Sequence, residues 1–304
     1  MSKHILSVKN LVKRYGSFAA VDGVDFDIFD GEVFGILGPN GAGKTTMLEC
    51  IEGLRVPTLG SISVAGLHPL CNRRKLRKTL GVQLQTSALP EVMLAHEAMT
   101  LVCAYHGIKP RDDLMKRFGL DELKNKQYGK MSTGQKRRLQ LALALAGSPK
   151  IVVLDEPTAG VDVQGRAELH ASIRELKAEG VTVILATHDM AEAEALCDRI
   201  AILISGKLEA LGTPEQVKAA GKAQTRVTVR TRHGSLLGQG GIQKATYTGE
   251  TEGFAQWLCQ DTAPAVMELL SSAINANDIV DDLRVERSSL EERFLEIVKG
   301  DKAS

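Results

Sequence analysis

The sequence predicts an α/β fold in which a mainly parallel sheet forms the core, followed by a smaller α+β domain. Three short apolar runs support the first part of this prediction: residues 33–37, 151–154 and 181–186. Each run is almost continuously apolar, as expected of strands that are buried on both faces of a parallel sheet. Each is followed by turn residues and then by a helical pattern, which is the alternation typical of α/β domains.

The N-terminal third of the chain adds two further features. Apolar and polar residues alternate more in residues 5–8, 24–28 and 61–64, which predicts a small antiparallel β subdomain beside the parallel core. From about residue 73 to 146 the pattern is mainly helical. We expect this segment to be a helical insertion between two strands of the core.

The composition changes after about residue 221, where a short helix that opens near residue 212 is expected to end. Beyond it we expect a strand, an amphipathic helix, a second strand and a second helix, at 225–231, 263–273, 279–286 and 289–298. The predicted division is therefore a first domain over residues 1–221 and a small accessory α+β domain over residues 222–304.

The bulk composition narrows the classes of function. The formal net charge of +1 gives no sign of a surface for polyanions, so no nucleic-acid partner is expected. The five cysteines are scattered, which argues against a zinc site or a disulfide framework. The longest apolar stretch, residues 139–147, is far shorter than the roughly 20 residues of a membrane helix. We expect the chain not to cross a membrane by itself.

A glycine-rich loop follows the strand predicted at residues 33–37 and leads into a helical stretch. Its glycines let backbone N–H groups converge on phosphate oxygens, and the helix N-terminus adds donors and a favourable dipole. In this pattern the lysine reaches the β- and γ-phosphates and the next hydroxyl binds Mg²⁺. A glycine turn without a ligand is the alternative, but strand, loop and helix are all present, so the sequence predicts a P-loop NTPase core. The loop residues are Gly38, Pro39, Asn40, Gly41, Ala42, Gly43, Lys44, Thr45 and Thr46.

Acidic residues close the second predicted strand, and a histidine follows the third. Asp155 stands where a carboxylate beside a phosphate loop binds Mg²⁺, and Glu156 is placed to polarise the attacking water. The alternative is an acidic pair that caps the next turn. His188 is expected at the same edge of the sheet as Lys44, where a structural role and a role in sensing the γ-phosphate are both open.

A second candidate anion site lies at the start of a strong helical pattern over residues 136–145. Ser132 is a natural N-cap, and free N–H groups near Gly134 are suited to bind an anion. From these residues alone, a simple capped helix is the favoured interpretation.

Taken together, these segments resemble the ATP-binding subunits of ABC transporters, over about residues 5 to 217. The loop at residues 38–46 is similar to the Walker A motif, and residues 151–156 are similar to Walker B, which ends in a catalytic glutamate. Residues 131–135 resemble the family signature, with Thr133 in place of the usual glycine. The resemblance makes Asp162 part of the D-loop, His188 the switch histidine and Tyr15 the aromatic residue that stacks on adenine.

The family also has a glutamine that binds the metal ion and takes part in catalysis. Both Gln83 and Gln85 follow the short apolar segment at residues 80–82. Alignment with the family's strand that ends in glutamine favours Gln85, and Gln83 is then an ordinary strand residue.

The resemblance implies an ATPase that uses ATP and Mg²⁺, with Lys44, Gln85, Glu156 and His188 as its catalytic residues. In this family two subunits meet head to tail, so Ser132, Gly134 and Asp162 would serve the nucleotide of a second ATP-binding subunit. That subunit is either another copy of this chain or a different chain. A membrane-spanning permease subunit is also implied, and with it a peripheral place on the cytoplasmic face of the cell membrane.

The direction of transport is suggested by the C-terminal residues. Residues 279–295 are similar to the C-terminal extension of bacterial daunorubicin-type drug-export ATPases, in which a strand leads into a Ser-Leu-Glu-x-x-Phe-Leu helix. This favours an exporter. A non-transport ABC ATPase and an importer ATPase are the alternatives, and the first is disfavoured because the chain has one cassette and no heptad-rich insertion.

Overall fold

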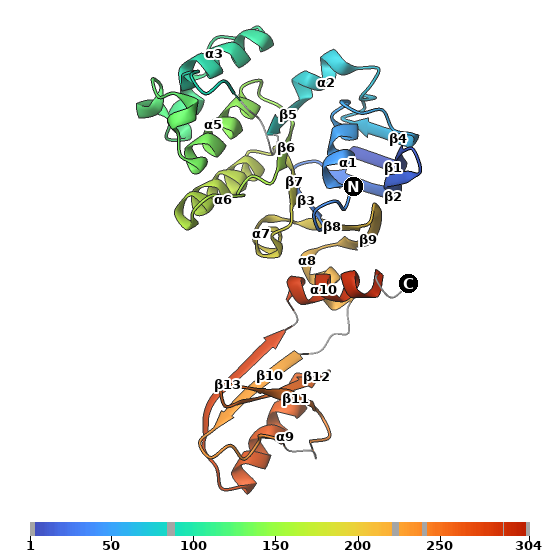
Figure 1. Cartoon of the computed structure of the whole chain (residues 1–304), viewed down its shortest axis with the longest axis vertical. Coiled ribbons are helices and arrows are strands. Elements are labelled where there is room, and N and C mark those ends of the chain that lie inside the picture. Colours follow the sequence, from blue (N-terminus) through green and yellow to red (C-terminus); the bar gives the residue numbers. More distant parts are fainter. Residues whose placement is uncertain (1–3, 84–88, 221–224, 239–241, 288, 302–304) are drawn as a thin grey trace. The chain divides into compact units, whose positions relative to one another are not determined.

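The computed structural model describes residues 4–83, 89–220, 225–238, 242–287 and 289–301. The chain consists of two compact units, Met1–Pro214 and Glu215–Ser304 (Figure 1).

A six-stranded sheet forms the centre of the first unit, in the order β5-β6-β7-β3-β8-β9. All neighbouring strands are parallel except β8 and β9. Every residue of β3, β6 and β7 is buried, which confirms the interpretation of the three apolar runs as fully covered strands. The strands are β3 Val33–Leu37, β5 Leu80–Gln83, β6 Ile151–Asp155, β7 Thr182–Thr187, β8 Arg199–Ile204 and β9 Lys207–Gly212.

The register of the parallel strands determines which loops meet. Leu37 at the end of β3 pairs with Thr187 at the end of β7, and Asp155 at the end of β6 pairs with Ala186. The loops that follow these three strands therefore leave the sheet at one edge, which is where open α/β sheets bind their ligands.

A three-stranded antiparallel sheet, in the order β2-β1-β4, lies beside the parallel sheet and shares a hydrophobic core with it. The strands are β1 His4–Tyr15, β2 Phe18–Phe29 and β4 Leu59–Val64. The predicted segments 5–8 and 24–28 are parts of the two longer strands. Register shifts at Val8/Leu11 and Leu11/Lys13 interrupt the period of two along β1, so its second half carries no clear alternation.

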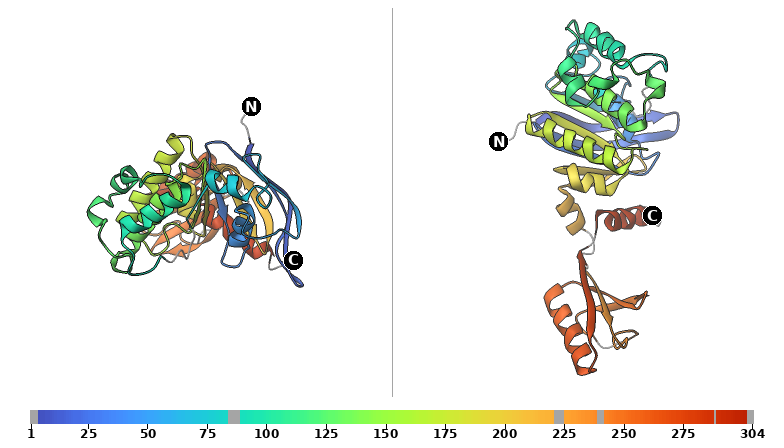
Figure 2. Two further views of the ribbon diagram at one scale, coloured as in Figure 1. Left: turned by 90° about the horizontal axis from the view of Figure 1, so that it is seen from above. Right: turned by 90° about the vertical axis from the view of Figure 1, so that its left-hand side faces the viewer.

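The helical insertion is found, with one difference from the prediction. Residues 80–83, within the range expected to be mainly helical, form β5, an edge strand of the central sheet. Gln83 lies in this strand, as its alignment with the family implied, whereas four residues are too few to give a clear strand pattern of their own. In Figure 2 the insertion (green) and the antiparallel sheet (blue) lie at opposite ends of the unit. The helices of the unit are α1 Lys44–Ile51, α2 Arg73–Thr79, α3 Ala95–His106, α4 Asp112–Arg117, α5 Thr133–Leu145, α6 Val163–Ala178 and α7 Met190–Leu196, with 3-10 turns at Asp121–Leu123 and Tyr128–Lys130.

The second unit has its own core, formed where α9 packs on one face of an antiparallel sheet in the order β11-β12-β10-β13. The predicted strands and helices of this unit are present, whereas β11 and β12 were not predicted. Its strands are β10 Thr225–Thr231, β11 Thr246–Thr251, β12 Phe254–Cys259 and β13 Val280–Arg287, and its helices are α9 Thr262–Asn275 and α10 Leu290–Asp301. Helix α8, Pro214–Ala219, stands at the boundary of the two units.

Among the helices of the described residues, none has the length and apolar composition needed to cross a membrane.

Candidate functional site

The glycine-rich loop turns directly from β3 into α1 and is held close to two neighbouring strands. Gly43 has a φ of +101°, and a Cβ atom at this position would clash with the carbonyl oxygen of Ala20 in β2. A Cβ atom on Gly38 would clash in the same way with the carbonyl oxygen of Leu203 in β8. Only glycine permits both close approaches, so the two residues fix the path of the loop.

Lys44, the first residue of α1, is buried beneath this loop. Its Nζ donates hydrogen bonds to the carbonyl oxygens of Gly38 (2.7 Å) and Pro39 (3.2 Å). It also lies 4.0 Å from Oε1 of Glu156. Burial lowers the pKa of Lys44, and the charges of Glu156 and Asp155 act against that shift. The ammonium is thus held at the strand edge close to two carboxylates.

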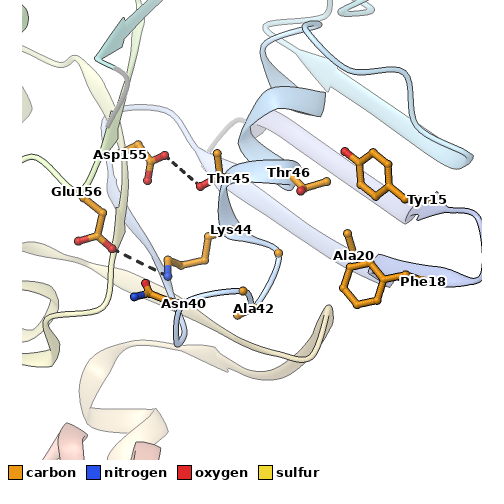
Figure 3. Close-up of a pocket in the computed structure, with 12 residues that line it drawn as sticks. Tyr15, Phe18, Ala20, Asn40, Ala42, Lys44, Thr45, Thr46, Asp155 and Glu156 are labelled. Atoms are coloured by element: carbon orange, nitrogen blue, oxygen red, sulfur yellow. Dashed lines mark hydrogen bonds and ion pairs between the residues drawn. The ribbon is translucent and has the colours of Figure 1, made fainter. Parts of the chain in front are cut away.

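Thr45 of α1 and Asp155 at the end of β6, two of the three predicted metal ligands, are in contact. The hydroxyl of Thr45 donates to Oδ2 of Asp155 at 3.2 Å. Burial raises the pKa of Asp155, and this hydrogen bond from Thr45 opposes the shift. The structure therefore brings a hydroxyl and a carboxylate to one point beside the loop (Figure 3).

Glu156 and His188 meet across the ends of β6 and β7. The backbone of Glu156 has a φ of +51°, which is uncommon for a residue with a side chain and typical of functional sites. Its N–H donates to the carbonyl oxygen of Ala186 at 2.9 Å, which anchors this conformation. Nδ1 of His188 lies 2.8 Å from Oε1 and 2.7 Å from Oε2 of the glutamate.

A cavity of about 490 Å³ joins the loop to the first hairpin (Figure 3). Tyr15 at the end of β1 lines it together with the acidic pair Asp155 and Glu156. Phe18 and Ala20 of β2 line it as well, although no sequence motif singles them out. The sequence signal that could have identified them is the short turn at residues 16–17, which brings Phe18 opposite Tyr15 in the hairpin. The lining residues are Tyr15, Phe18, Ala20, Asn40, Gly41, Ala42, Gly43, Lys44, Thr45, Thr46, Asp155 and Glu156.

The signature segment lies outside this lining. Ser132 caps α5 as predicted, because its Oγ accepts the N–H of Gln135 at 3.3 Å and the Gln135 side chain accepts the N–H of Ser132 at 3.1 Å. Asp162 caps α6 through the N–H of Gly165 at 3.2 Å. Neither cap residue nor Gly134 lines the cavity that contains Lys44.

Of the two candidates for the metal-binding glutamine, one lies within the described residues. Gln85 lies outside the described residues. Gln83 is the last residue of β5 and is 1% exposed. Within the described part of the chain, neither of its side-chain amide atoms has a hydrogen-bond partner.

The donor atoms near the loop suit Mg²⁺. No group of three or more His, Cys, Asp or Glu side chains among the described residues is arranged to hold a metal ion. Mg²⁺ needs no such group, because it commonly binds one or two protein oxygens, the phosphates of a nucleotide and several waters. Oxygens of Thr45 and Asp155, in contact beside the loop, form a donor set of this kind.

Comparisons with known proteins agree with this geometry. A family model described as ABC transporter matches residues 21–159. A daunorubicin resistance ATP-binding protein of Streptomyces coeruleorubidus is 34% identical to the chain, and the match covers 99% of this chain and 98% of that protein. A Nod factor export ATP-binding protein of Rhizobium sp. (strain N33) is 38% identical, with 70% of this chain and 72% of that protein covered.

A solved structure extends the likeness to the fold. It is the dimeric structure of a post-hydrolysis state of an ATP-binding cassette bound to ADP and Pi, with a TM-score of 0.62 and 28% identity. The match covers 68% of this chain and 98% of that one.

Proposed function

The chain belongs to the ABC transporter family of ATP-binding proteins, and from that premise we propose that it powers export through a separate membrane-spanning subunit. It is an ATPase with the cassette fold of that family. Two observations favour export. Both relatives described above are named for drug resistance or export, and the likeness to the drug-resistance protein continues through the second unit.

The cavity at the end of β3 is the proposed ATP site. The loop residues 38–46 bind the phosphates through backbone N–H groups and Lys44, and Tyr15 stacks on the adenine. Mg²⁺, when bound through Thr45 and Asp155, neutralises negative charge on the phosphates. Gln85 is the proposed further ligand.

Glu156 is the proposed catalytic base. Its buried carboxylate lies at the strand edge beside Lys44, where it can orient a water molecule toward the γ-phosphate and accept its proton. His188 contacts both oxygens of this carboxylate and therefore holds it in one orientation. Lys44 stabilises the charge that builds up on the transferred group.

A second ATP-binding subunit completes the proposed site. Ser132, Gly134 and Asp162 lie outside the cavity of their own chain, although a capped helix N-terminus is suited to bind phosphate. We assign them to the nucleotide of a second subunit that joins head to tail. ATP then closes the pair, and hydrolysis opens it.

The membrane-spanning partner places this chain, as a peripheral subunit, on the cytoplasmic face of the membrane. Closure and opening of the ATP-bound pair are transmitted to that partner and drive substrate across.

Dimer closure tests the core of this proposal. The Glu156→Gln variant, loaded with ATP and Mg²⁺, is expected to double its mass from 32.8 kDa in light scattering. The matched control carries Lys44→Ala in addition and should remain monomeric. A Glu156→Gln variant that stays monomeric at saturating ATP would contradict a homodimer of this chain.

The transport role needs a separate test. The chain is purified from native membranes, and the polytopic protein that accompanies it is reconstituted in vesicles. We expect that protein to raise the ATPase rate of the wild-type chain and not that of Glu156→Gln. If no membrane protein accompanies the chain or none changes its rate, a non-transport ATPase is the better assignment.

A further inference from the structure

Two cations lie against the ring of Tyr15, a residue that also lines the cavity. Nζ of Lys13 is 5.0 Å from the ring centroid, and Cζ of Arg55 is 5.5 Å from it. Tyr15 itself lines the cavity, whereas Lys13 and Arg55 do not. The ring thus borders the cavity and also contacts two cations that do not line it.

Both cations are held in place by other groups. Arg55 forms a two-pronged ion pair with Glu49 of α1, through Nε and Nη2. Nζ of Lys13 donates to the carbonyl oxygen of Val56 at 2.9 Å. The segment that carries Arg55 and Val56 is anchored in turn, because the N–H of Arg55 donates to the carbonyl oxygen of Glu49 at 3.0 Å.

The same segment is also tied by hydrogen bonds to β1, the strand that ends at Tyr15. The N–H of Thr58 donates to the carbonyl oxygen of Val12 at 2.7 Å, and the N–H of Arg14 donates to Oγ1 of Thr58 at 3.0 Å. Strand β1 and the segment after α1 therefore form one rigid frame around the tyrosine.

We propose that Lys13 and Arg55 are positioning residues that hold Tyr15 as the platform for the nucleotide base. This inference rests on the proposed function, in which Tyr15 stacks on adenine. It goes further because it assigns base affinity to two residues that do not line the cavity.

The physical basis is the attraction between a cation and the face of an aromatic ring. A cation held against the ring restrains its rotation, so that the part of the ring that lines the cavity is presented to a base in a fixed orientation. At solvent-exposed sites such a contact changes a binding constant by about two- to five-fold. We expect the loss of a cation to weaken binding of the base and to leave binding of the triphosphate unchanged.

The test compares Lys13→Gln and Arg55→Gln in the full-length chain. Each variant should raise the KM for ATP by about two- to five-fold at unchanged kcat. The Ki of inorganic tripolyphosphate, which has no base, should stay at the wild-type value. Arg55→Lys keeps a cation near the ring and should recover part of the loss.

Arg14→Gln is the matched control. It removes one positive charge from the same strand, but the Arg14 side chain pairs with Asp22 and not with Tyr15. Its KM for ATP should equal that of the wild type, which separates ring positioning from a general loss of positive charge.

A double-mutant cycle decides whether the two cations act through the ring. Tyr15→Ala should raise the KM for ATP about ten-fold, the loss expected for one stacked base. In that background Arg55→Gln should have no further effect. A further rise there, or a parallel rise in the Ki of tripolyphosphate, would overturn the inference.

The KM of Tyr15→Ala alone distinguishes a failure of the proposed adenine stacking from a failure of the proposed positioning role of Lys13 and Arg55. An unchanged KM in this variant removes adenine stacking on Tyr15 from the proposed function, and the inference fails with it. A raised KM in Tyr15→Ala with wild-type values in Lys13→Gln and Arg55→Gln overturns the inference alone.

Discussion

Nδ1 of His188 lies within 2.8 Å of both carboxylate oxygens of Glu156. The histidine side chain is 58% exposed, whereas that of the glutamate is 6% exposed. A solvent-accessible group at the end of β7 is therefore joined to a buried carboxylate at the end of β6. The contact follows from the register of the sheet, which places the two strand ends side by side.

Replacement of Glu156 by Gln should separate binding from turnover. The amide keeps the shape of the side chain but cannot accept a proton, so we expect kcat to fall by at least about 100-fold. ATP binding should remain within a few-fold of the wild type, because Lys44 and the loop are unchanged. Steady-state ATPase assays and equilibrium ATP binding measure the two effects, and turnover close to that of the wild type would contradict the assignment of Glu156.

His188→Ala should reduce kcat by about ten-fold or more without a comparable loss of ATP affinity, because the glutamate loses the group that orients it. His170→Ala is the matched control. His170 also contacts a glutamate, Glu192 at 3.3 Å, but it belongs to α6 and not to the cavity. Equal effects of the two substitutions on kcat would show that the His188 contact has no special role.

The path of the phosphate loop predicts that replacing two of its glycines by alanine lowers the stability of the protein by different amounts. Gly43→Ala should destabilise the protein by roughly 2 kcal/mol or more, since its Cβ would clash with the backbone of β2 at a positive φ. Gly41→Ala also has a positive φ, +83°, but no atom lies within 4 Å of the added Cβ. In urea unfolding without nucleotide, this control should lower the free energy of unfolding by only about 1 kcal/mol. Equal costs would mean that the loop can move away from Ala20.

The parts that could be predicted from sequence have a strong local signal. The runs that became β3, β6 and β7 are apolar at nearly every position because both faces are covered. The glycines and the lysine of the phosphate loop lie at fixed spacings within one short segment, so the motif can be recognised without knowledge of the fold. Strand β8 at residues 199–204 has a similar apolar run and was open to the same interpretation, whereas β12 depends on pairing with β10 and β11 and has no regular alternation of its own.

The shape of the candidate site was less accessible to prediction. Phe18 joins the cavity only because a tight hairpin brings it back beside Tyr15, and the ring contacts of Lys13 and Arg55 depend on how β1 meets the segment after α1. The contact of Arg55 with Tyr15 and the hydrogen bond that holds Lys13 on Val56 each join residues about 40 positions apart. The sequence pattern records the period of each strand, but it does not record which strands become neighbours.

Glu52, at the end of α1, should make stability depend on pH. Its Oε2 is buried and, within the described residues, has no hydrogen-bond partner. Burial raises the pKa of Glu52 to about 8, with smaller contributions from the charges of Asp155 and Glu49. The folded state therefore binds a proton that the unfolded state releases near pH 4.5. The resulting stabilisation is complete below pH 4.5 and is lost as the pH rises to about 8.

Glu52→Gln removes this titration. The free energy of unfolding of the variant relative to the wild type should grow between about pH 5 and pH 8 and reach at least about 1 kcal/mol in favour of the variant. Urea unfolding at several pH values measures it. A difference that stays constant over this range would show that the carboxyl is solvated and titrates normally.

Asp278 should stabilise the second unit at neutral pH and lose this effect in acid, which is the opposite of the pH dependence expected for Glu52. Its side chain is 2% exposed and accepts the backbone N–H groups of His233, Ser235 and Ile279. Burial alone would raise the pKa of Asp278, but these hydrogen bonds outweigh it and hold the pKa well below the ordinary value of 3.8. The stabilisation is therefore present above pH 3.8 and is lost as the pH falls below it.

Asp278→Asn should lower the urea midpoint of the second unit at pH 7, because the amide is a weaker acceptor than the carboxylate. Trp257 is the single tryptophan of the chain and is 1% exposed in the core of this unit, so its fluorescence reports on that unit alone. The difference from the wild type should shrink as the pH is lowered through 3.8. Asp282→Asn, which removes a surface partner of Arg284, is the control and should leave the midpoint nearly unchanged. A difference for Asp278→Asn that does not depend on pH would place the effect in the shape of the side chain and not in its charge.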